Sequence, residues 1–111
     1  MTESEFIALT ERVLNLLGET LDADAADLDW QLNDGILEIE CADGSKLIVN
    51  RHVPNREIWV AARSGGFHFR ADGGVWRDTR SGGELAAQLT RVLRDQSGLA
   101  VDLSQLPPPL A

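Results

Sequence analysis

Hydrophobic residues recur every three to four positions near both ends of the chain and every second position in between. The first pattern predicts an amphipathic helix over about residues 4–21 and another from Leu85 until Gly98. The second pattern predicts short β-strands, six of which follow one another from Leu28 to Arg77 with turn residues between them. The sequence therefore predicts an α+β fold, a two-layer sandwich with both helices on one face of an antiparallel sheet of about six strands.

The ends of the two helices carry local signals. Thr2 and Glu5 have the spacing of a capping box before the first helix, and Ser81 and Glu84 repeat it before the second. Gly18 costs about 1 kcal/mol relative to alanine in a helix interior. We therefore expect the last turn of the first helix to fray.

Length and cysteine content limit the kind of protein. The 111 residues fit one domain, so we expect a single unit over residues 1–111, with residues 104–111 as a tail and a short extended piece at Val101 and Leu103. Cys41 is the single cysteine; it is expected to point into the core and excludes an intramolecular disulfide or a multi-thiolate metal site. The sequence has no apolar run long enough for a membrane span and no secretory signal pattern, so we expect a cytoplasmic protein without a membrane partner.

Charge is distributed unevenly along the chain. Residues 1–45 hold twelve acidic residues against the single base Arg12, a local balance of −11, whereas the rest carries +3. The acidic half would repel nucleic-acid phosphates. We therefore expect no nucleic-acid partner, and instead cations or basic protein surfaces.

Part of this acidity forms a stripe on the first predicted helix. The stripe lies opposite the apolar face and consists of Glu11, Asn15, Glu19 and Asp22, with Glu3 and Asp24 nearby. Successive members are 4, 4 and 3 residues apart, which places them on one side of a helix. Such carboxylates attract hard cations, but without histidine or a preformed cage the binding should be weak and rich in water. The alternative is a solvated helix face that only keeps the protein soluble. A solubilising face would intersperse lysines, and this one has only Arg12, which favours a binding role. The acidic residues 22–27 that follow are expected to form an exposed loop.

Alternation also predicts which side chains the sheet turns away from the helices. If Ile58 and Val60 face the helices, Trp59 points to solvent, and Asn50 and His68 on the neighbouring strands point the same way. An exposed tryptophan in a polar setting is typical of protein–protein hot spots rather than of a catalytic pocket. A register shifted by one residue would instead bury Trp59.

Signals for catalysis are weak. His52 and His68 are the only histidines, and no serine or cysteine lies in a recognisable nucleophile pattern. A metal site on these two histidines would lack carboxylates beside them. The glycine doublets lack the lysine and hydroxyl residue of a phosphate loop. We therefore expect no enzymatic activity and no catalytic residues.

Several motifs together resemble the frataxin family. The most specific is the N-R-x-x-P-x-x-x-I-W pattern that starts at Asn50. The others occur in the family's order and are Ser4-Glu5-Phe6, residues 33–37 and residues 64–69. The similarity covers nearly all of residues 3–103 and points to the bacterial branch of the family.

The resemblance implies two helices on one face of an antiparallel sheet and an outward Trp59. It also implies weak binding of iron through an acidic ridge that Glu11, Glu19 and Asp22 match. Asn50 and Trp59 match a sheet surface that faces partner proteins. In this family the C-terminal segment can cover the groove between the helices; a frayed tail is the alternative here.

The resemblance therefore leads us to expect an iron-binding regulator of iron–sulfur cluster assembly. Its partners would be the cysteine desulfurase and the scaffold protein, and its ligand would be Fe2+ or Fe3+ held weakly. An iron carrier or store that donates Fe(II) to the scaffold is the main alternative, and a binding module without a metal role is another. We expect a monomer, with an iron-dependent oligomer as the alternative.

Overall fold

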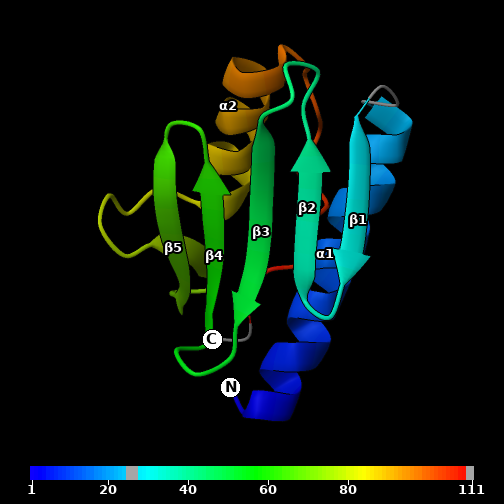
Figure 1. The fold of residues 1–111 in the computed structure, drawn as a ribbon. Helices are drawn as coiled ribbons and strands as arrows, with labels where there is room; N and C mark the ends of the chain where they lie inside the picture. The colour runs from blue at the N-terminus through cyan, green and yellow to red at the C-terminus, as the bar shows by residue number, and fades with distance from the viewer. Residues whose placement is uncertain (25–27, 110–111) are drawn as a thin grey trace.

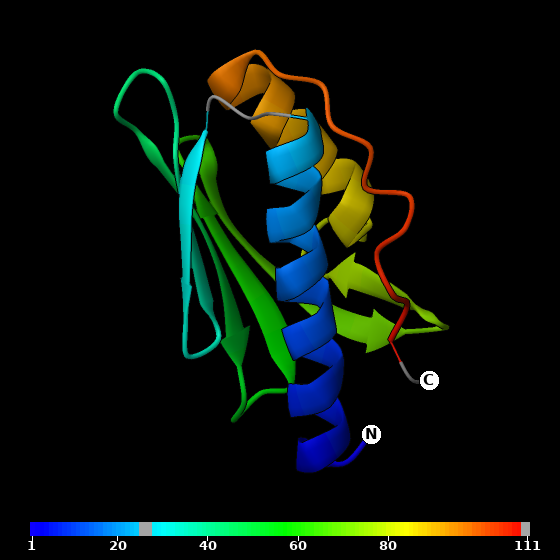
Figure 2. The same cartoon turned by 90° about the vertical axis from the view of Figure 1, so that its right-hand side faces the viewer.

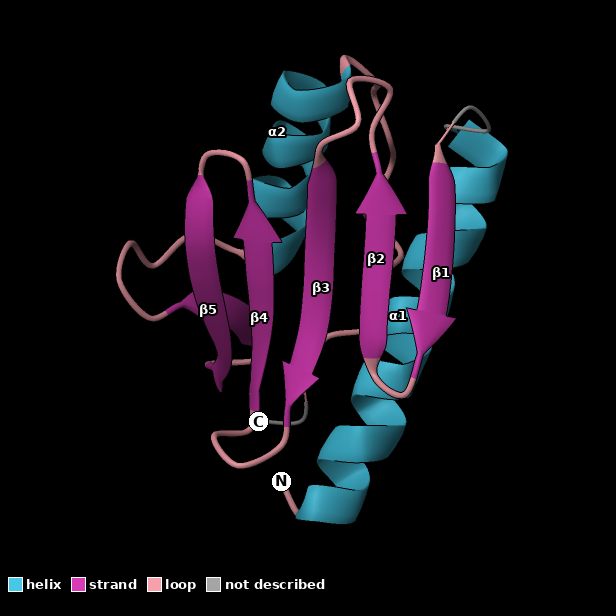
Figure 3. Cartoon of the chain, viewed as in Figure 1, coloured by secondary structure: helices cyan, strands magenta, loops and turns pink. Residues whose placement is uncertain are grey.

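The computed structural model describes residues 1–24 and 28–109 and has two layers. The elements are α1 (Glu3–Asp24), β1 (Asp29–Asn33), β2 (Ile36–Glu40), β3 (Lys46–His52), β4 (Glu57–Ala62), β5 (Gly65–Asp72), β6 (Val75–Asp78) and α2 (Leu85–Ser97). The six strands form one antiparallel sheet in chain order, so each strand pairs with the next (Figures 1 and 3). Both helices lie on the same side of this sheet (Figure 2). The predicted α+β sandwich is confirmed.

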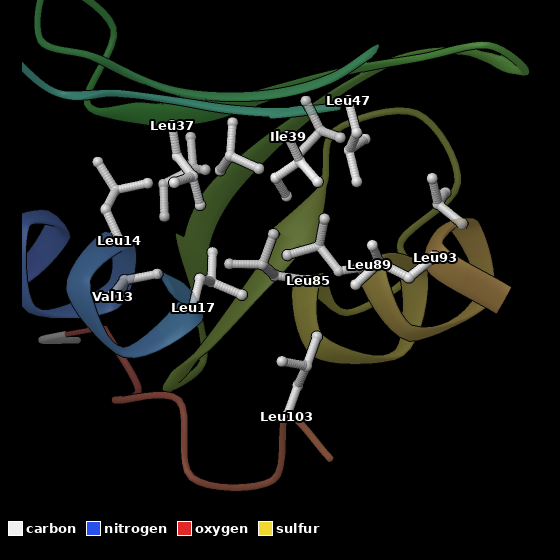
Figure 4. Close-up of a cluster of buried hydrophobic side chains, with 14 of the residues drawn as sticks. Val13, Leu14, Leu17, Leu37, Ile39, Leu47, Leu85, Leu89, Leu93 and Leu103 are labelled. Carbon is white, nitrogen blue, oxygen red and sulfur yellow. The ribbon is translucent and has the colours of Figure 1, made fainter. Parts of the chain in front are cut away.

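The hydrophobic core fills the space between the sheet and the helices (Figure 4). Alternate strand positions face inward, and the buried ones include Leu37, Ile39, Leu47, Val49, Ile58, Val60 and Phe69. Each such side chain contributes about 1.5–3 kcal/mol when it is fully buried. This burial fixes which face of every strand points toward the helices. Cys41 is also buried, so its predicted inward position is confirmed.

The first helix and the last strand of the sheet meet in the core. Phe6 near the start of α1 contacts Trp76 of β6 edge to face, with ring centroids 6.2 Å apart and an interplanar angle of 71°. Edge-to-face packing is a favourable arrangement of two aromatic rings. The contact joins the first helix to the last strand.

The first helix begins as predicted and ends later than predicted. Thr2 N–H donates to Glu5 Oε1 at 2.7 Å and Glu5 N–H donates to Thr2 Oγ1 at 3.1 Å, so the capping box is formed. At the other end α1 continues through Asp22 to Asp24. The expectation of a frayed last turn and of a loop from residue 22 is wrong for residues 22–24, and residues 25–27 lie outside the described part of the chain.

The indole of Trp30 packs on α1 where the helix passes Gly18. Gly18 is buried, and a Cβ atom at this position would lie 2.7 Å from Cη2 of Trp30, too close for two nonbonded carbon atoms. The same indole donates its N–H to Oδ1 of Asp22 at 2.8 Å. Trp30 therefore packs on the helix at Gly18 and is hydrogen-bonded to it one turn later.

The second helix begins without the predicted capping box. It starts at Leu85, and the N-cap residue Glu84 makes no side-chain capping hydrogen bond. Ser81 instead donates its hydroxyl to Oδ2 of Asp78 at 2.8 Å. The prediction is wrong because this contact holds Ser81 in the turn after β6. Gly98 ends the helix as predicted, with a φ of 73°.

The C-terminal segment runs along the helices (Figure 2), and its last described residue, Pro109, is buried. Val101 and Leu103 are buried, and Leu106 packs against the core. Residues 101–103 form no strand with any described residue, so the segment is held by side-chain burial rather than by sheet pairing. Of the two alternatives for the tail, the described residues favour a cover over the helices.

Replacing Gly18 with alanine should destabilise the protein. Alanine normally favours a helix over glycine by about 1 kcal/mol, but here its methyl group overlaps Trp30. Such overpacking costs about 1–3 kcal/mol, so we expect a lower free energy of unfolding in urea denaturation. In a Trp30→Leu background the overlap is absent, and Gly18→Ala should then be neutral or stabilising. An equal effect in both backgrounds would contradict the packing explanation.

Candidate functional site

The predicted acidic stripe forms an exposed ridge on α1. Glu11, Asn15, Glu19 and Asp22 are all exposed, while the opposite face of the helix is buried in the core. We refer to these four residues, with Glu3 and Asp24, as the acidic ridge. The side-chain NH2 group of Asn15 is already engaged, since it donates to the backbone carbonyl oxygen of Glu11 at 2.9 Å.

Part of the ridge is neutralised by arginines from other elements. Nη1 of Arg51 on β3 lies 2.7 Å from Oε2 of Glu11, and Nη2 of Arg56 lies 3.7 Å from Oε1 of Glu3. Arg12 is the single base within α1, as the sequence indicates, and these two arginines come from β3 and from the turn that follows it. The arginine side chain at 51 is 15% exposed, so its pair with Glu11 is better shielded from solvent than an ordinary surface ion pair.

The unneutralised charge is concentrated at the C-terminal end of α1. Among the described residues, Glu19, Asp22 and Asp24 form no ion pair. The last turn of the helix contains no basic residue, although the C-terminus of a helix carries about half a negative charge. Acidic side chains at this end have the same sign as the partial charge of the helix C-terminus, so the two contributions to the negative potential add. This end of the ridge is the part best suited to bind a cation or a basic surface.

The ridge offers carboxylate oxygens but no chelating cage. In residues 1–24 and 28–109 no three His, Cys, Asp or Glu side chains lie close enough to hold one metal ion. Oxygen ligands suit hard cations, including iron, but one or two carboxylates leave most of the coordination shell to water. The donor set therefore fits an ion that is weakly held and largely hydrated, and it does not fit a buried structural metal.

The outward face of the sheet carries the second group of candidate residues. Asn50, Trp59 and His68 lie opposite one another across β3, β4 and β5 and are half-buried. Ile36 of β2 pairs with Asn50 in the same row and is 45% exposed. The predicted register, with Trp59 on the face away from the helices, is confirmed.

Two histidines enclose the Trp59 indole. The imidazole of His52 stacks on it with centroids 3.7 Å apart and an interplanar angle of 7°, and His68 stacks on it at 4.2 Å and 9°. Because the indole lies between the two imidazoles, they cannot ligate one ion, and the alternative of a histidine-pair metal site is wrong. We refer to His52, Trp59 and His68 as the aromatic stack. His52 is not among the predicted outward residues, although the register of β3 and β4 makes it a diagonal cross-strand neighbour of Trp59.

Glu57 holds the indole from the side. It lies on the same face of the sheet as Trp59, but it is only 3% exposed. Its Oε1 accepts the Trp59 Nε1 hydrogen at 2.8 Å, and its Oε2 accepts hydrogen bonds from Nη2 and Nε of Arg70 at 2.7 and 3.1 Å. Burial alone would raise the pKa of Glu57, but the hydrogen bonds from Trp59 and Arg70 and the charge of Arg70 together lower this pKa below its usual value.

Neutralising Glu57 should destabilise the protein in a pH-dependent way. Because the folded-state pKa is lowered, the ionised carboxylate stabilises the protein above its unfolded pKa of about 4.3. This stabilisation is lost as the pH falls through the lower folded-state pKa. We expect Glu57→Gln to reduce the free energy of unfolding at pH 7 by about 1–3 kcal/mol, and the difference from wild type to narrow below pH 4. Urea denaturation at pH 7 and pH 3.5 measures both values, with Asp72→Asn as the exposed-acid control. A difference that stays constant with pH would contradict the role of the ionised carboxylate.

Comparisons with known sequences agree with this arrangement. Residues 1–99 match the family model described as frataxin-like domain. The chain is 54% identical over 104 residues to the iron-sulfur cluster assembly protein CyaY of Dechloromonas aromatica, which covers 93% of this chain and 99% of the relative. It is 42% identical over 106 residues to the protein of the same name from Neisseria meningitidis serogroup B, with 96% and 99% covered.

Solved structures of similar proteins have the same fold. Frataxin from Psychromonas ingrahamii superposes with a TM-score of 0.87 at 33% identity, covering 95% of this chain and all of the other. Trimeric frataxin from the yeast Saccharomyces cerevisiae, complexed with ferrous iron, gives a TM-score of 0.67 at 26% identity, covering 85% and 86% of the two chains. In the described part of this chain, no helix has the length and apolar character that a bilayer crossing requires.

Proposed function

This chain belongs to the frataxin-like family, and we propose that it is an iron-binding regulator of iron–sulfur cluster assembly. In this proposal it binds the cysteine desulfurase together with its scaffold protein. The observation that supports the proposal most directly is the uncompensated charge of Glu19, Asp22 and Asp24 at the end of α1. The proposal involves no catalytic step by this chain.

Docking would use both candidate surfaces. The exposed acids would attract a basic patch on the desulfurase complex and orient its approach. The aromatic stack and Asn50 would supply the apolar and hydrogen-bonding contacts, since a held tryptophan is a typical binding hot spot. Association should weaken as salt is added, because the Debye length falls from about 10 Å at 0.1 M to about 3 Å at 1 M.

Iron would act through the same carboxylates. When bound, a hard cation at Glu19 or Asp22 adds positive charge to the surface that meets the basic partner. Glu11 is less available for this role because Arg51 lies 2.7 Å from it. Iron and partner would thus be coupled through one small group of acids, and iron abundance would alter how the protein binds the assembly machinery.

The initial rate of cluster assembly tests the regulator. Adding this protein to a purified scaffold and desulfurase under anaerobic conditions should lower the rate, and Fe(II) should deepen the inhibition. Glu19→Lys should weaken the effect and its salt dependence, because it reverses a charge in the docking surface. Asp95→Lys makes the same charge change on α2, away from the ridge, and should behave as wild type. If the wild-type protein leaves the initial rate of cluster assembly unchanged at every Fe(II) concentration, the proposed regulatory function is wrong.

A second function, that of an iron carrier or store, is favoured by one comparison. The yeast relative with the same fold is trimeric and was solved with ferrous iron. A store should grow in size when iron is added, whereas a regulator needs no assembly. Size-exclusion chromatography with light scattering, with and without anaerobic Fe(II), separates the two. We expect a monomer in both conditions, and an iron-dependent oligomer together with a raised assembly rate would favour the carrier.

A further inference from the structure

We infer that Trp30 is a positioning residue of the acidic ridge: it fixes the carboxylate of Asp22 and thereby sets how tightly the C-terminal end of α1 binds cations. This inference rests on the proposed function, because it concerns the same surface. Nothing in the charge pattern of the sequence marks Trp30, which lies on the edge strand β1 opposite Ile39.

Two contacts fix the indole in place. Its six-membered ring lies on Gly18, where Cη2, Cζ2 and Cζ3 are the atoms that any side chain at position 18 would meet. Its N–H donates to Oδ1 of Asp22 at 2.8 Å. Because Gly18 and Asp22 are one helical turn apart, the indole spans the turn on which this end of the ridge is built.

The hydrogen bond also determines which oxygen Asp22 can offer. Oδ1 is occupied by the indole, whereas Oδ2 accepts no hydrogen bond from any described residue. A carboxylate held in this way loses less side-chain freedom when a cation binds. In complete metal sites, losing such an outer hydrogen bond typically weakens affinity by about 10- to 100-fold. The ridge has no three-ligand cage, so a smaller change is expected here.

Phenylalanine separates the hydrogen bond from the packing. Trp30→Phe keeps an aromatic ring near Gly18 but has no N–H for Asp22, whereas Trp30→Leu removes both. Gln31→Ala on the adjacent position of β1 is the matched control, since Gln31 is exposed and lies on the other face of the sheet. Urea denaturation of each variant shows whether the fold is retained.

The indole N–H signals in nuclear magnetic resonance provide a readout that needs no metal. The three tryptophans differ in environment, because Trp59 donates to Glu57 and the Trp76 nitrogen is buried without a partner among the described residues. Trp30→Phe identifies the Trp30 signal by its absence. In wild type this N–H should exchange slowly with water, and Asp22→Ala should accelerate the exchange severalfold. Unchanged exchange in Asp22→Ala would overturn the inference without touching the proposed function.

Titration with Mn2+ alone tests the effect on the ridge. Broadening of the Glu19 backbone amide signal reports binding, and we expect Trp30→Phe to reduce the affinity by about threefold to tenfold, with Gln31→Ala equal to wild type. Equal affinity of Trp30→Phe and wild type, with Glu19 still broadened in both, would overturn the inference alone. If Mn2+ leaves the ridge amides unaffected even in wild type, both the cation-binding part of the proposed function and the inference are wrong.

Discussion

The alternation of inward and outward side chains in the sheet is the constraint on which the other features depend. Leu47, Val49, Ile58 and Val60 can be buried under the helices only if Asn50 and Trp59 point the other way. The requirement for a dry core therefore also assembles the polar and aromatic face on the opposite side. The same constraint applies to helix α1, because burying its apolar side places Glu11, Glu19 and Asp22 in solvent. Both candidate surfaces are consequences of where the core lies.

Electrostatics then divides the ridge into two functionally different parts. Arg51 and Arg56 reach across from the sheet region and compensate Glu11 and Glu3 near the start of the helix. The end of the helix receives no such compensation from the described residues, and its own dipole adds to the negative potential. Such an arrangement costs some stability, and the binding of cations or of a basic partner that we propose would require it. A surface that binds cations or a basic partner cannot also be neutralised by its own chain.

The sequence was sufficient for the fold and for the orientation of the main site residues. Periodicity predicted both helices, the six strands and the outward row of Asn50, Trp59 and His68, because side-chain period depends only on local geometry and burial. It could not predict the contact of Arg51 with Glu11, which are 40 residues apart in the chain. The stacking of His52 on Trp59 was missed because it depends on the register of β3 and β4. The error at Ser81 has a different origin, since two local interactions compete there and the hydrogen bond to Asp78 forms in place of the capping box. Gly18 was judged by helix propensity alone, and its partner Trp30 lies on another element.

The contact between Phe6 and Trp76 has a consequence for the order in which the protein can form during translation. Phe6 of α1 packs against a tryptophan of the last strand of the sheet, about seventy residues later in the chain. Local strand pairs can form as soon as each hairpin has emerged, because every strand pairs with its immediate successor. Most of α1 can then pack on β1, β2 and β3, but the first turns of the helix around Phe6 stay uncovered until β6 has been made. The part of the core around Phe6 is therefore closed only after the last strand has been synthesised.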